Sequence, residues 1–314
     1  EDGEAKAIEY EVESIIPGNT TGVVRDYTIS LKCTDPYFKD LADIEVVMAS
    51  WVSDFYFPAC FPEEGRIFGH READLVKEIA SLPDTSDILL FLGMDTRYRM
   101  PQAGVNAIRL LKKAGIVFTV LLEEPDSGYT LDTLVGAEET RETMKKAADI
   151  LSRYKTVVAF DPADAKVFQR EYKEWDIPIR TQVKTFTEYV TDMIAAGRLK
   201  PKKKSGTVTI QDPALLARDL EESDPLRVAV SACADIREML LNRKDTMWAG
   251  NLLMDTWMPE VMLKVAEERW RNALASGADT LVTASPSEYA ILKKAKPEDM
   301  ELLSLEELLL LMTK

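Results

Sequence analysis

The chain has 314 residues, and its 54 acidic against 39 basic side chains give it a formal net charge of −15. This length corresponds to about two domains, and a hydrophobic content of 46% is enough for a packed core. Such a charge repels phosphate backbones and anionic lipids, so nucleic acid is excluded as an expected partner, whereas a basic protein would be attracted.

The three cysteines, Cys33, Cys60 and Cys233, are widely spaced and include no Cys-x-x-Cys pair. So small and odd a number indicates a reducing compartment, and we expect a cytoplasmic protein without a disulfide framework. A membrane-spanning helix needs about 20 uninterrupted apolar residues, and no stretch comes close to that length. No transmembrane segment is therefore predicted.

Residues 1–85 are predicted to be an N-terminal extension whose fold the pattern does not define. Residues 10–16 and 23–32 favour β-structure, and residues 71–81 favour a helix. Between them, residues 51–68 form an aromatic, turn-rich stretch with two prolines. Aromatic residues are enriched at interfaces, but a local core explains this stretch equally well.

Residues 86–199 are predicted to form a first α/β lobe. Strands are expected at residues 87–92, 117–122 and 156–160, and helices at residues 103–114, 138–154 and 163–175. The strands are nearly continuous apolar runs, as in strands that are buried on both faces. Their alternation with helices predicts a parallel sheet built from βαβ units.

Residues 200–206 (KPKKKSG) form a basic break that is typical of a solvated linker, and residues 207–314 repeat the pattern as a second lobe. Strands are expected at residues 207–211 and 280–284, and helices at residues 235–241, 259–276, 285–294 and 302–312. Residues 147–172 and 271–294 share one order: helix, turn, apolar strand, proline-containing turn, helix. The fold class is therefore α/β, with two similar Rossmann-like parallel-sheet lobes related by an internal duplication of roughly 120 residues and an irregular N-terminal region.

Short segments between the predicted strands and helices carry a second pattern. In the second lobe these segments are Gln211-Asp212-Pro213-Ala214, Trp248-Ala249-Gly250 and Ser285-Pro286-Ser287-Glu288. In the first lobe they are Met94, Asp126-Ser127-Gly128 and Asp161-Pro162-Ala163-Asp164. Their prolines and glycines resemble those of the cysteine-rich (CCG) domain family, the heterodisulfide reductase B/D-like iron–sulfur proteins. The pattern of that family is a single cysteine, then Cys-Cys-Gly, then Cys-Pro-x-Cys, and the whole pattern occurs twice.

The resemblance implies that the cluster cysteines have been lost. The positions it would assign to them hold Met94, Asp126, Ser127, Asp161, Asp164, Ala214, Trp248, Ala249, Ser285 and Glu288. Iron–sulfur clusters are bound by soft thiolates, and none of these side chains is a thiolate. We therefore expect these to be vacated cluster positions, with no cofactor, no metal and no catalytic residue.

Polar replacements in the first lobe leave another possibility open. If Asp126, Ser127, Asp161 and Asp164 converge, their oxygens would suit Mg²⁺ or Ca²⁺. The favoured interpretation is structural, with Asp161 and Ser285 capping helices that start at a proline, and Asp126 making hydrogen bonds within its turn.

Other chemistry has little support. His70, the only histidine, could be a base or a metal ligand but lacks a partner motif, so a structural role is favoured. Cys60 is expected to be a buried small hydrophobe rather than a reactive thiol. No G-x-S-x-G, G-x-G-x-x-G or G-x-x-x-x-G-K-[ST] motif occurs.

Two functions remain. The first, favoured by the resemblance, is a non-catalytic, cluster-less subunit that scaffolds or docks partners in a multisubunit redox complex, including cluster-bearing homologues. On this interpretation the chain is not an enzyme by itself. The alternative is a small-molecule-binding protein or enzyme that uses the vacated cleft, because parallel α/β sheets bind ligands at the carboxyl ends of their strands.

Overall fold

A computed structural model of the chain describes residues 10–21, 24–33, 73–134, 136, 138–203 and 206–313. Strands β1 (Tyr10–Thr21) and β2 (Val24–Cys33) pair as an antiparallel hairpin, which confirms the predicted β-structure of this region. The aromatic stretch at residues 51–68, with Cys60, and the nearby His70 lie outside the described residues. A separate compact unit, formed by His70–Tyr129 and Arg141–Lys314, holds both parallel sheets.

The first sheet has the strand order β3-β4-β5, and all of its strands are parallel. Its strands are β3 (Ile88–Phe91), β4 (Thr156–Ala159) and β5 (Gln182–Thr185). Its α-helices are α3 (Ala73–Ala80), α4 (Met94–Tyr98), α5 (Pro101–Lys113), α6 (Tyr129–Leu134), α7 (Glu138–Leu151), α8 (Pro162–Lys166), α9 (Tyr172–Glu174) and α10 (Phe186–Ala195). A π-helical turn, η2 (Val167–Glu171), joins α8 to α9.

The second sheet has the order β7-β6-β8-β9 and is also parallel. Its strands are β6 (Thr207–Gln211), β7 (Asp235–Ile236), β8 (Thr280–Thr283) and β9 (Glu301–Ser304). Its helical elements are η3 (Leu215–Asp219), α11 (Asp224–Ser231), η4 (Arg243–Asp245), α12 (Leu252–Asp255), α13 (Pro259–Ala275), α14 (Pro286–Lys294) and α15 (Leu305–Met312).

The two lobes repeat one topology. Thr119 bridges to Leu89 on the edge of β3, in the place that β7 takes beside β6. Equivalent helices also begin alike: α8 and α14 start with a proline, and α10 and α15 start with a capping box. Both observations agree with the internal duplication inferred from the sequence.

The strand predicted at residues 117–122 is wrong except at Thr119, which forms a single β-bridge. Thr119 exchanges backbone hydrogen bonds with Ile88 and Leu90, both at 2.9 Å, but pairing ends there. The carbonyls of Leu121 and Leu122 accept from the buried guanidinium of Arg97 instead. A long-range side chain thus takes the groups that would have extended the sheet.

Two predicted helices are also corrected. Residues 235–241 begin as the short strand β7, because Asp235 and Ile236 pair with Thr207 and Val208 of β6. The predicted helix at residues 302–312 begins later, at α15, because its first residues belong to β9. In both places pairing with a neighbouring strand overrides local helix propensity.

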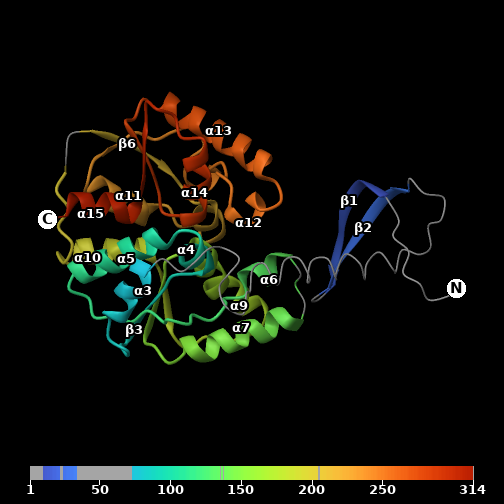
Figure 1. The fold of residues 1–314 in the computed structure, drawn as a ribbon, viewed down its shortest axis with the longest axis horizontal. Helices are drawn as coiled ribbons and strands as arrows, with labels where there is room; N and C mark the ends of the chain where they lie inside the picture. Colours follow the sequence, from blue (N-terminus) through green and yellow to red (C-terminus); the bar gives the residue numbers. More distant parts are fainter. Residues whose placement is uncertain are drawn as a thin grey trace. The chain divides into compact units, whose positions relative to one another are not determined.

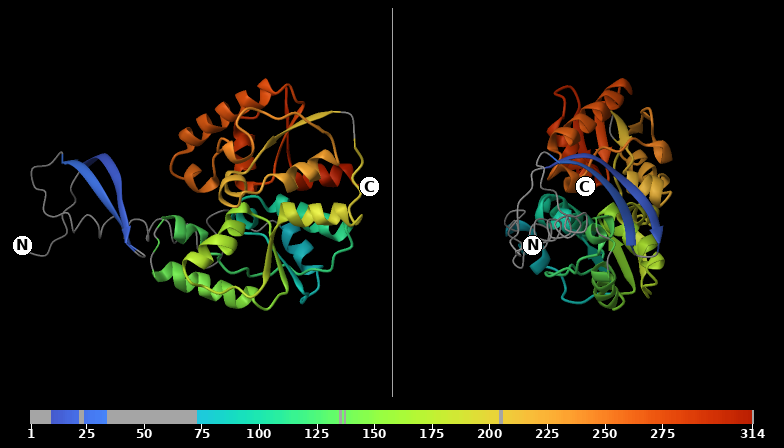
Figure 2. Two further views of the ribbon diagram at one scale, coloured as in Figure 1. Left: turned by 180° about the vertical axis from the view of Figure 1, so that it is seen from behind. Right: turned by 90° about the vertical axis from the view of Figure 1, so that its right-hand side faces the viewer.

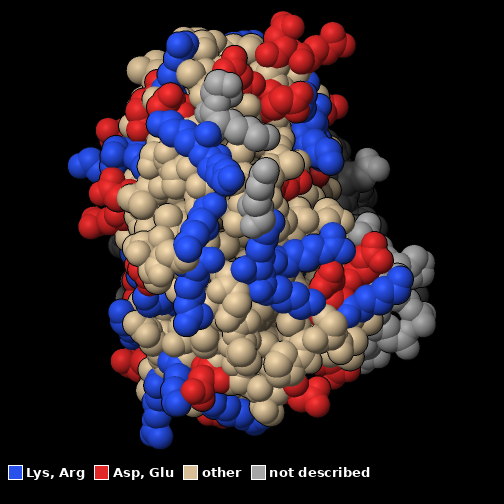
Figure 3. Space-filling model, turned by 90° about the vertical axis from the view of Figure 1, so that its left-hand side faces the viewer, with Lys and Arg blue, Asp and Glu red and all other residues tan. Residues whose placement is uncertain are grey.

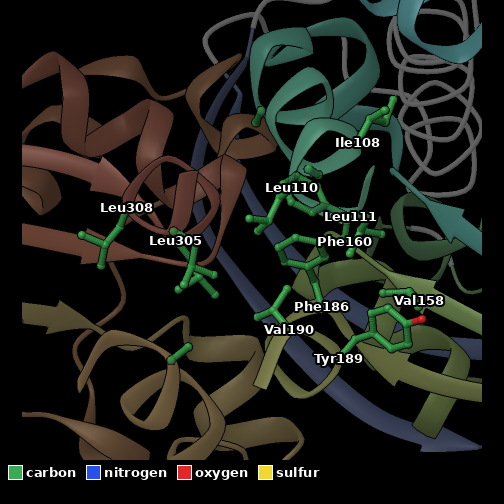
Figure 4. Close-up of a cluster of buried hydrophobic side chains, with 14 of the residues drawn as sticks. Ile108, Leu110, Leu111, Val158, Phe160, Phe186, Tyr189, Val190, Leu305 and Leu308 are labelled. Atoms are coloured by element: carbon green, nitrogen blue, oxygen red, sulfur yellow. The ribbon is translucent and has the colours of Figure 1, made fainter. Parts of the chain in front are cut away.

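One hydrophobic core joins the two lobes. Helices α5 and α10 of the first lobe pack against α15 and α11 of the second, between the two sheets (Figures 1 and 2). Figure 4 shows side chains of this shared core, among them Leu110, Phe160 and Phe186 from the first lobe and Leu305 and Leu308 from the second. Smaller cores cover the outer face of each sheet. The inner helices therefore hold the turns after the strands of both lobes in fixed relation.

Candidate functional site

A pocket lies where the carboxyl ends of the strands of both lobes meet. Its empty space, counted with its open mouth, is about 430 Å³. It is lined by Asp95, Tyr129, Asp161, Pro162, Ala163, Pro213, Leu215, Trp248, Gly250, Asn251, Leu253, Ser285, Ser287 and Glu288. Turns after β3, β4, β6 and β8 all contribute, as expected for a parallel α/β sheet.

The structure brings most of the predicted turns to this pocket. Of the predicted residues, Asp161, Trp248, Ser285 and Glu288 line it directly. Met94, Ala214 and Ala249 do not line it, but each has a chain neighbour that does. Asp126, Ser127 and Asp164 do not line it either.

The carboxyl groups of the first lobe are held by backbone amides. Asp161 caps α8 by accepting from the amide of Ala163 at 3.0 Å, and Asp126 accepts from the amide of Gly128 at 2.8 Å. Both structural roles predicted for these residues are confirmed. Ser285 likewise caps α14.

Glu124 and Asp95 were not foreseen. The carboxylate of Glu124 accepts from the amides of Leu92 and Gly93 at 2.8 and 2.7 Å, directly after β3. Asp95 lines the pocket and accepts a hydrogen bond from the hydroxyl of Ser287 in the other lobe. A usable signal existed for Glu124, which closely follows an apolar run.

Gly93 makes the close packing around Asp164 possible. Its φ of 83° lies in the left-handed region, and a Cβ at this position would overlap the Oδ2 atom of Asp164. Asp164 is itself buried and hydrogen-bonded to Ser127. Only glycine allows the turn after β3 to approach the turn after β4 this closely.

In the second lobe, a chain of buried hydrogen bonds fixes the position of Glu288. It accepts from the amide of Ala214 at 3.0 Å and from Nε2 of Gln211 at 2.7 Å. Gln211 accepts in turn from the guanidinium of Arg269, which is fully buried. Arg269 also donates to the carbonyls of Leu240 and Leu241 at 3.0 and 2.9 Å, so it fixes the loop that follows β7.

A buried ion-pair network anchors the turn after β6. Two nitrogens of Arg227 donate to the two oxygens of Asp212 at 2.6 and 2.9 Å, and Arg227 also contacts Glu238 at 2.7 and 2.8 Å. The amide of Arg243 donates to Asp212 at 2.6 Å. The family resemblance singled out the turn that contains Asp212, but it offered no hint of Arg227, which lies on α11.

Burial raises the pKa of several carboxyl groups at the site. Burial, reinforced by the charge of Asp95, raises the pKa of Asp161 to about 7. Burial is also the main cause that raises the pKa of Glu288 to about 7 and that of Asp126 to about 6. Burial and neighbouring Asp161 raise the pKa of Asp164 well above its ordinary value. The site therefore carries less negative charge at neutral pH than its composition suggests.

The residues of this pocket do not fit an iron–sulfur cluster. None of the lining residues is a cysteine. The carboxyl groups of Asp95, Asp161 and Glu288 are hard oxygen donors, and those of Asp161 and Glu288 already accept from backbone amides. Cys233 lies in the shared core, where burial raises the pKa of its thiol to about 11. In the described ranges, no group of three or more His, Cys, Asp or Glu side chains could hold a metal ion.

Replacing Asp161 with asparagine is expected to stabilise the chain above pH 7 and to change little near pH 4. The pKa of this carboxyl is about 4 in the unfolded chain and about 7 in the folded one. The folded state therefore binds more protons between these two pH values. The contribution of this group to the free energy of unfolding therefore falls as pH rises through that window. Asparagine keeps the capping oxygen and does not titrate.

Thermal melting from pH 4 to pH 8 tests this expectation. The melting temperature of the wild type should fall more steeply with pH than that of the Asp161→Asn variant. Asp149→Asn, at an exposed position of α7, should keep the wild-type slope. Parallel curves for the wild type and Asp161→Asn would show that Asp161 keeps an ordinary pKa.

Together the fold and the pocket define a class: two-lobed α/β proteins with duplicated parallel sheets and a pocket between their carboxyl edges. In sequence, the chain is similar to the D subunit of dihydromethanophenazine:CoB--CoM heterodisulfide reductase. It is 26% identical over 221 residues to the protein of Methanosarcina acetivorans, covering 65% of this chain and 53% of that one. For Methanosarcina mazei the identity is 25% over 220 residues with the same coverage. The chain spans about half the length of the curated relatives it matches, and no protein-family profile matches it.

Solved structures add only a distant likeness. Glutamate racemase RacE1 of Bacillus anthracis aligns with a TM-score of 0.33 and 15% identity over 73% of this chain and 80% of that one. An aspartate racemase homologue of Pyrococcus horikoshii has a TM-score of 0.31 and 10% identity over 70% and 94%. These values support no inference about this chain. Among the described helices, none has the length and apolar character needed to cross a bilayer.

Proposed function

We propose that this chain is a cluster-less, heterodisulfide reductase B/D-like protein that docks or scaffolds other subunits of a multisubunit redox complex, including cluster-bearing homologues. On this proposal it performs no catalysis itself, and the complex is cytoplasmic. The observation that carries the proposal is the pocket between the lobes. Most of the turns that would carry cluster ligands meet there, and carboxyl, hydroxyl and indole side chains of these turns line the pocket.

Internal hydrogen bonding supports a structural role for these replacements. Helix N-termini favour negative charge, and cluster thiolates at such turns would supply it. Here Asp161 and Glu288 supply oxygens instead, and each accepts from a backbone amide of its own lobe. These hydrogen bonds support the proposal that the turns keep their shape through protein contacts alone.

The comparison supports membership of a redox assembly. The relatives are named as subunits of a heterodisulfide reductase, so they act within a larger complex. The similarity covers 65% of this chain, and it supports the proposal that this chain binds partner subunits of a related kind.

Iron and sulfide analysis of the purified full chain tests the absence of a cluster. We expect iron far below one atom per chain and no broad visible absorption. Near-stoichiometric iron with such a band would contradict the proposal. Purification from the native host under anaerobic conditions tests docking: iron-containing subunits should co-elute in fixed ratio, whereas a lone monomer would contradict the proposed role.

One observation favours the alternative, a small-molecule site. The pocket is open and combines Trp248 and Tyr129 with several polar groups, as ligand sites often do. A metabolite library screened by thermal shift against the wild type and Trp248→Ala separates the two functions. A ligand that stabilises only the wild type, with no co-purifying subunit, would favour the alternative.

A further inference from the structure

A basic face lies on the side of the molecule away from the pocket, at the amino-terminal edge of the sheets. We define it by six exposed side chains: Lys112, Lys113, Arg198, Lys200, Lys202 and Lys203. They lie at the end of α5 and along the connection from α10 to β6. Figure 3 shows Lys and Arg side chains gathered across the middle of this side of the chain.

Backbone contacts hold these residues together. Pro201 forms an antiparallel bridge with Thr313, and the amide of Lys202 donates to the carbonyl of Met312 at 2.7 Å. The ammonium group of Lys113 donates to the carbonyl of Thr313. Leu199 is buried in the shared core, so the connection is anchored on both sides. The solvated linker predicted for residues 200–206 is therefore, over its first residues, a fixed surface segment.

Most of this positive charge is uncompensated. Lys112 pairs with Glu78 and Lys203 pairs with Asp235, both at 2.6 Å. Over the part of the chain that the structure describes, no carboxylate lies within ion-pair distance of the four remaining basic side chains. These four are Lys113, Arg198, Lys200 and Lys202. A concentration of free positive charge is unexpected on a chain of net charge −15.

Helix dipoles account for only part of the basic face. Lys112 and Lys113 lie in the last turn of α5, where cations are stabilised by the helix C-terminus. Lys200 and Lys202 lie beyond the end of α10, on the connection itself. Their clustering therefore calls for a different explanation.

We propose that the basic face is a docking surface for an acidic protein surface. This inference rests on the docking function proposed above and names the face that serves it. The net charge of −15 would attract a basic partner in general, whereas the basic face attracts an acidic one. Charge complementarity of this kind orients a partner and speeds its association, and it weakens with salt.

Fluorescence anisotropy with a fluorescein-labelled decaglutamate peptide tests the proposal on the full chain. The variant carries Lys113→Glu, Arg198→Glu, Lys200→Glu and Lys202→Glu. The control carries Lys145→Glu, Lys146→Glu, Lys173→Glu and Lys264→Glu, which change the net charge equally at exposed positions. We expect binding at low salt that is at least about tenfold weaker in the variant than in the control and is lost at high salt.

Several outcomes would overturn the proposal. If peptide binding is weakened equally in the variant and the control, binding depends only on the net charge of the chain. Displacement of the peptide by phosphate far better than by chloride of equal ionic strength would indicate a small-anion site instead. Far-UV circular dichroism confirms that both variants fold. If the variant still co-purifies with the subunits that the wild type retains, the basic face is not the docking surface, although the proposed function stands.

Discussion

Replacing Arg227 with methionine is expected to lower the free energy of unfolding by about 3–5 kcal/mol. The side chain of Asp212 is only 1% exposed, and Arg227 supplies its two guanidinium hydrogen bonds. Without Arg227 this carboxylate remains buried and loses the guanidinium that is hydrogen-bonded to it. Removing one partner of a buried ion pair costs far more than the pair itself contributes, because the remaining charge is desolvated.

Urea unfolding followed by tryptophan fluorescence measures the effect. Arg271→Met is the matched control, since Arg271 forms an exposed pair with Glu268 on α13 and should cost at most about 1 kcal/mol. The double variant Arg227→Met with Asp212→Asn should recover part of the loss, because the buried charge of Asp212 is removed and Glu238 is partly exposed. Equal costs for Arg227→Met and Arg271→Met would refute a buried network.

Replacing Leu110 with alanine is expected to cost about 2–5 kcal/mol and to destabilise both lobes together. Leu110 is fully buried in the core that the lobes share, near α15 of the second lobe (Figure 4). Truncation leaves a cavity between the inner helices, and close-packed cores relax only partly around one. Because the core is continuous, neither lobe can unfold without exposing the other.

Comparing two probes of one unfolding transition tests this coupling. Among the described tryptophans, Trp175 reports on the first lobe, and Trp248, Trp257 and Trp270 report on the second. Far-UV circular dichroism reports on both lobes. Tryptophan fluorescence and far-UV circular dichroism should give the same unfolding midpoint in the wild type, and Leu110→Ala should shift both midpoints equally. Leu311→Ala, at an exposed position of α15, should change little. A shift confined to one of two separate transitions would mean that the lobes fold independently, as the predicted boundaries at residues 86–199 and 207–314 would allow.

The alternation of elements was predictable because it depends on local pattern. Apolar runs at residues 87–92, 156–160, 207–211 and 280–284 predicted strands that the structure confirms as β3, β4, β6 and β8. Asp161 and Ser285, each before a proline, predicted the starts of α8 and α14. Caps and buried strands are set by neighbours in sequence, so composition and spacing suffice to find them.

The predictions failed where distant groups compete for the backbone. Arg97 takes the carbonyls of Leu121 and Leu122 and ends a strand, and pairing with β6 turns residues 235–236 from helix to strand. No local signal points to such contacts. The same reason explains why Arg227 and Arg269 were missed, since each reaches partners on other elements.

By itself, the sequence determined two duplicated α/β lobes, the order of their main elements, and the turns that hold no cysteine. The tertiary structure decided that most of these turns meet in one pocket, that a single core joins the lobes, and that scattered basic residues gather into one face. The division has a physical reason. Periodicity and capping report the burial and hydrogen bonds of neighbouring residues, whereas a pocket, a shared core and a charged face depend on which distant segments are packed side by side.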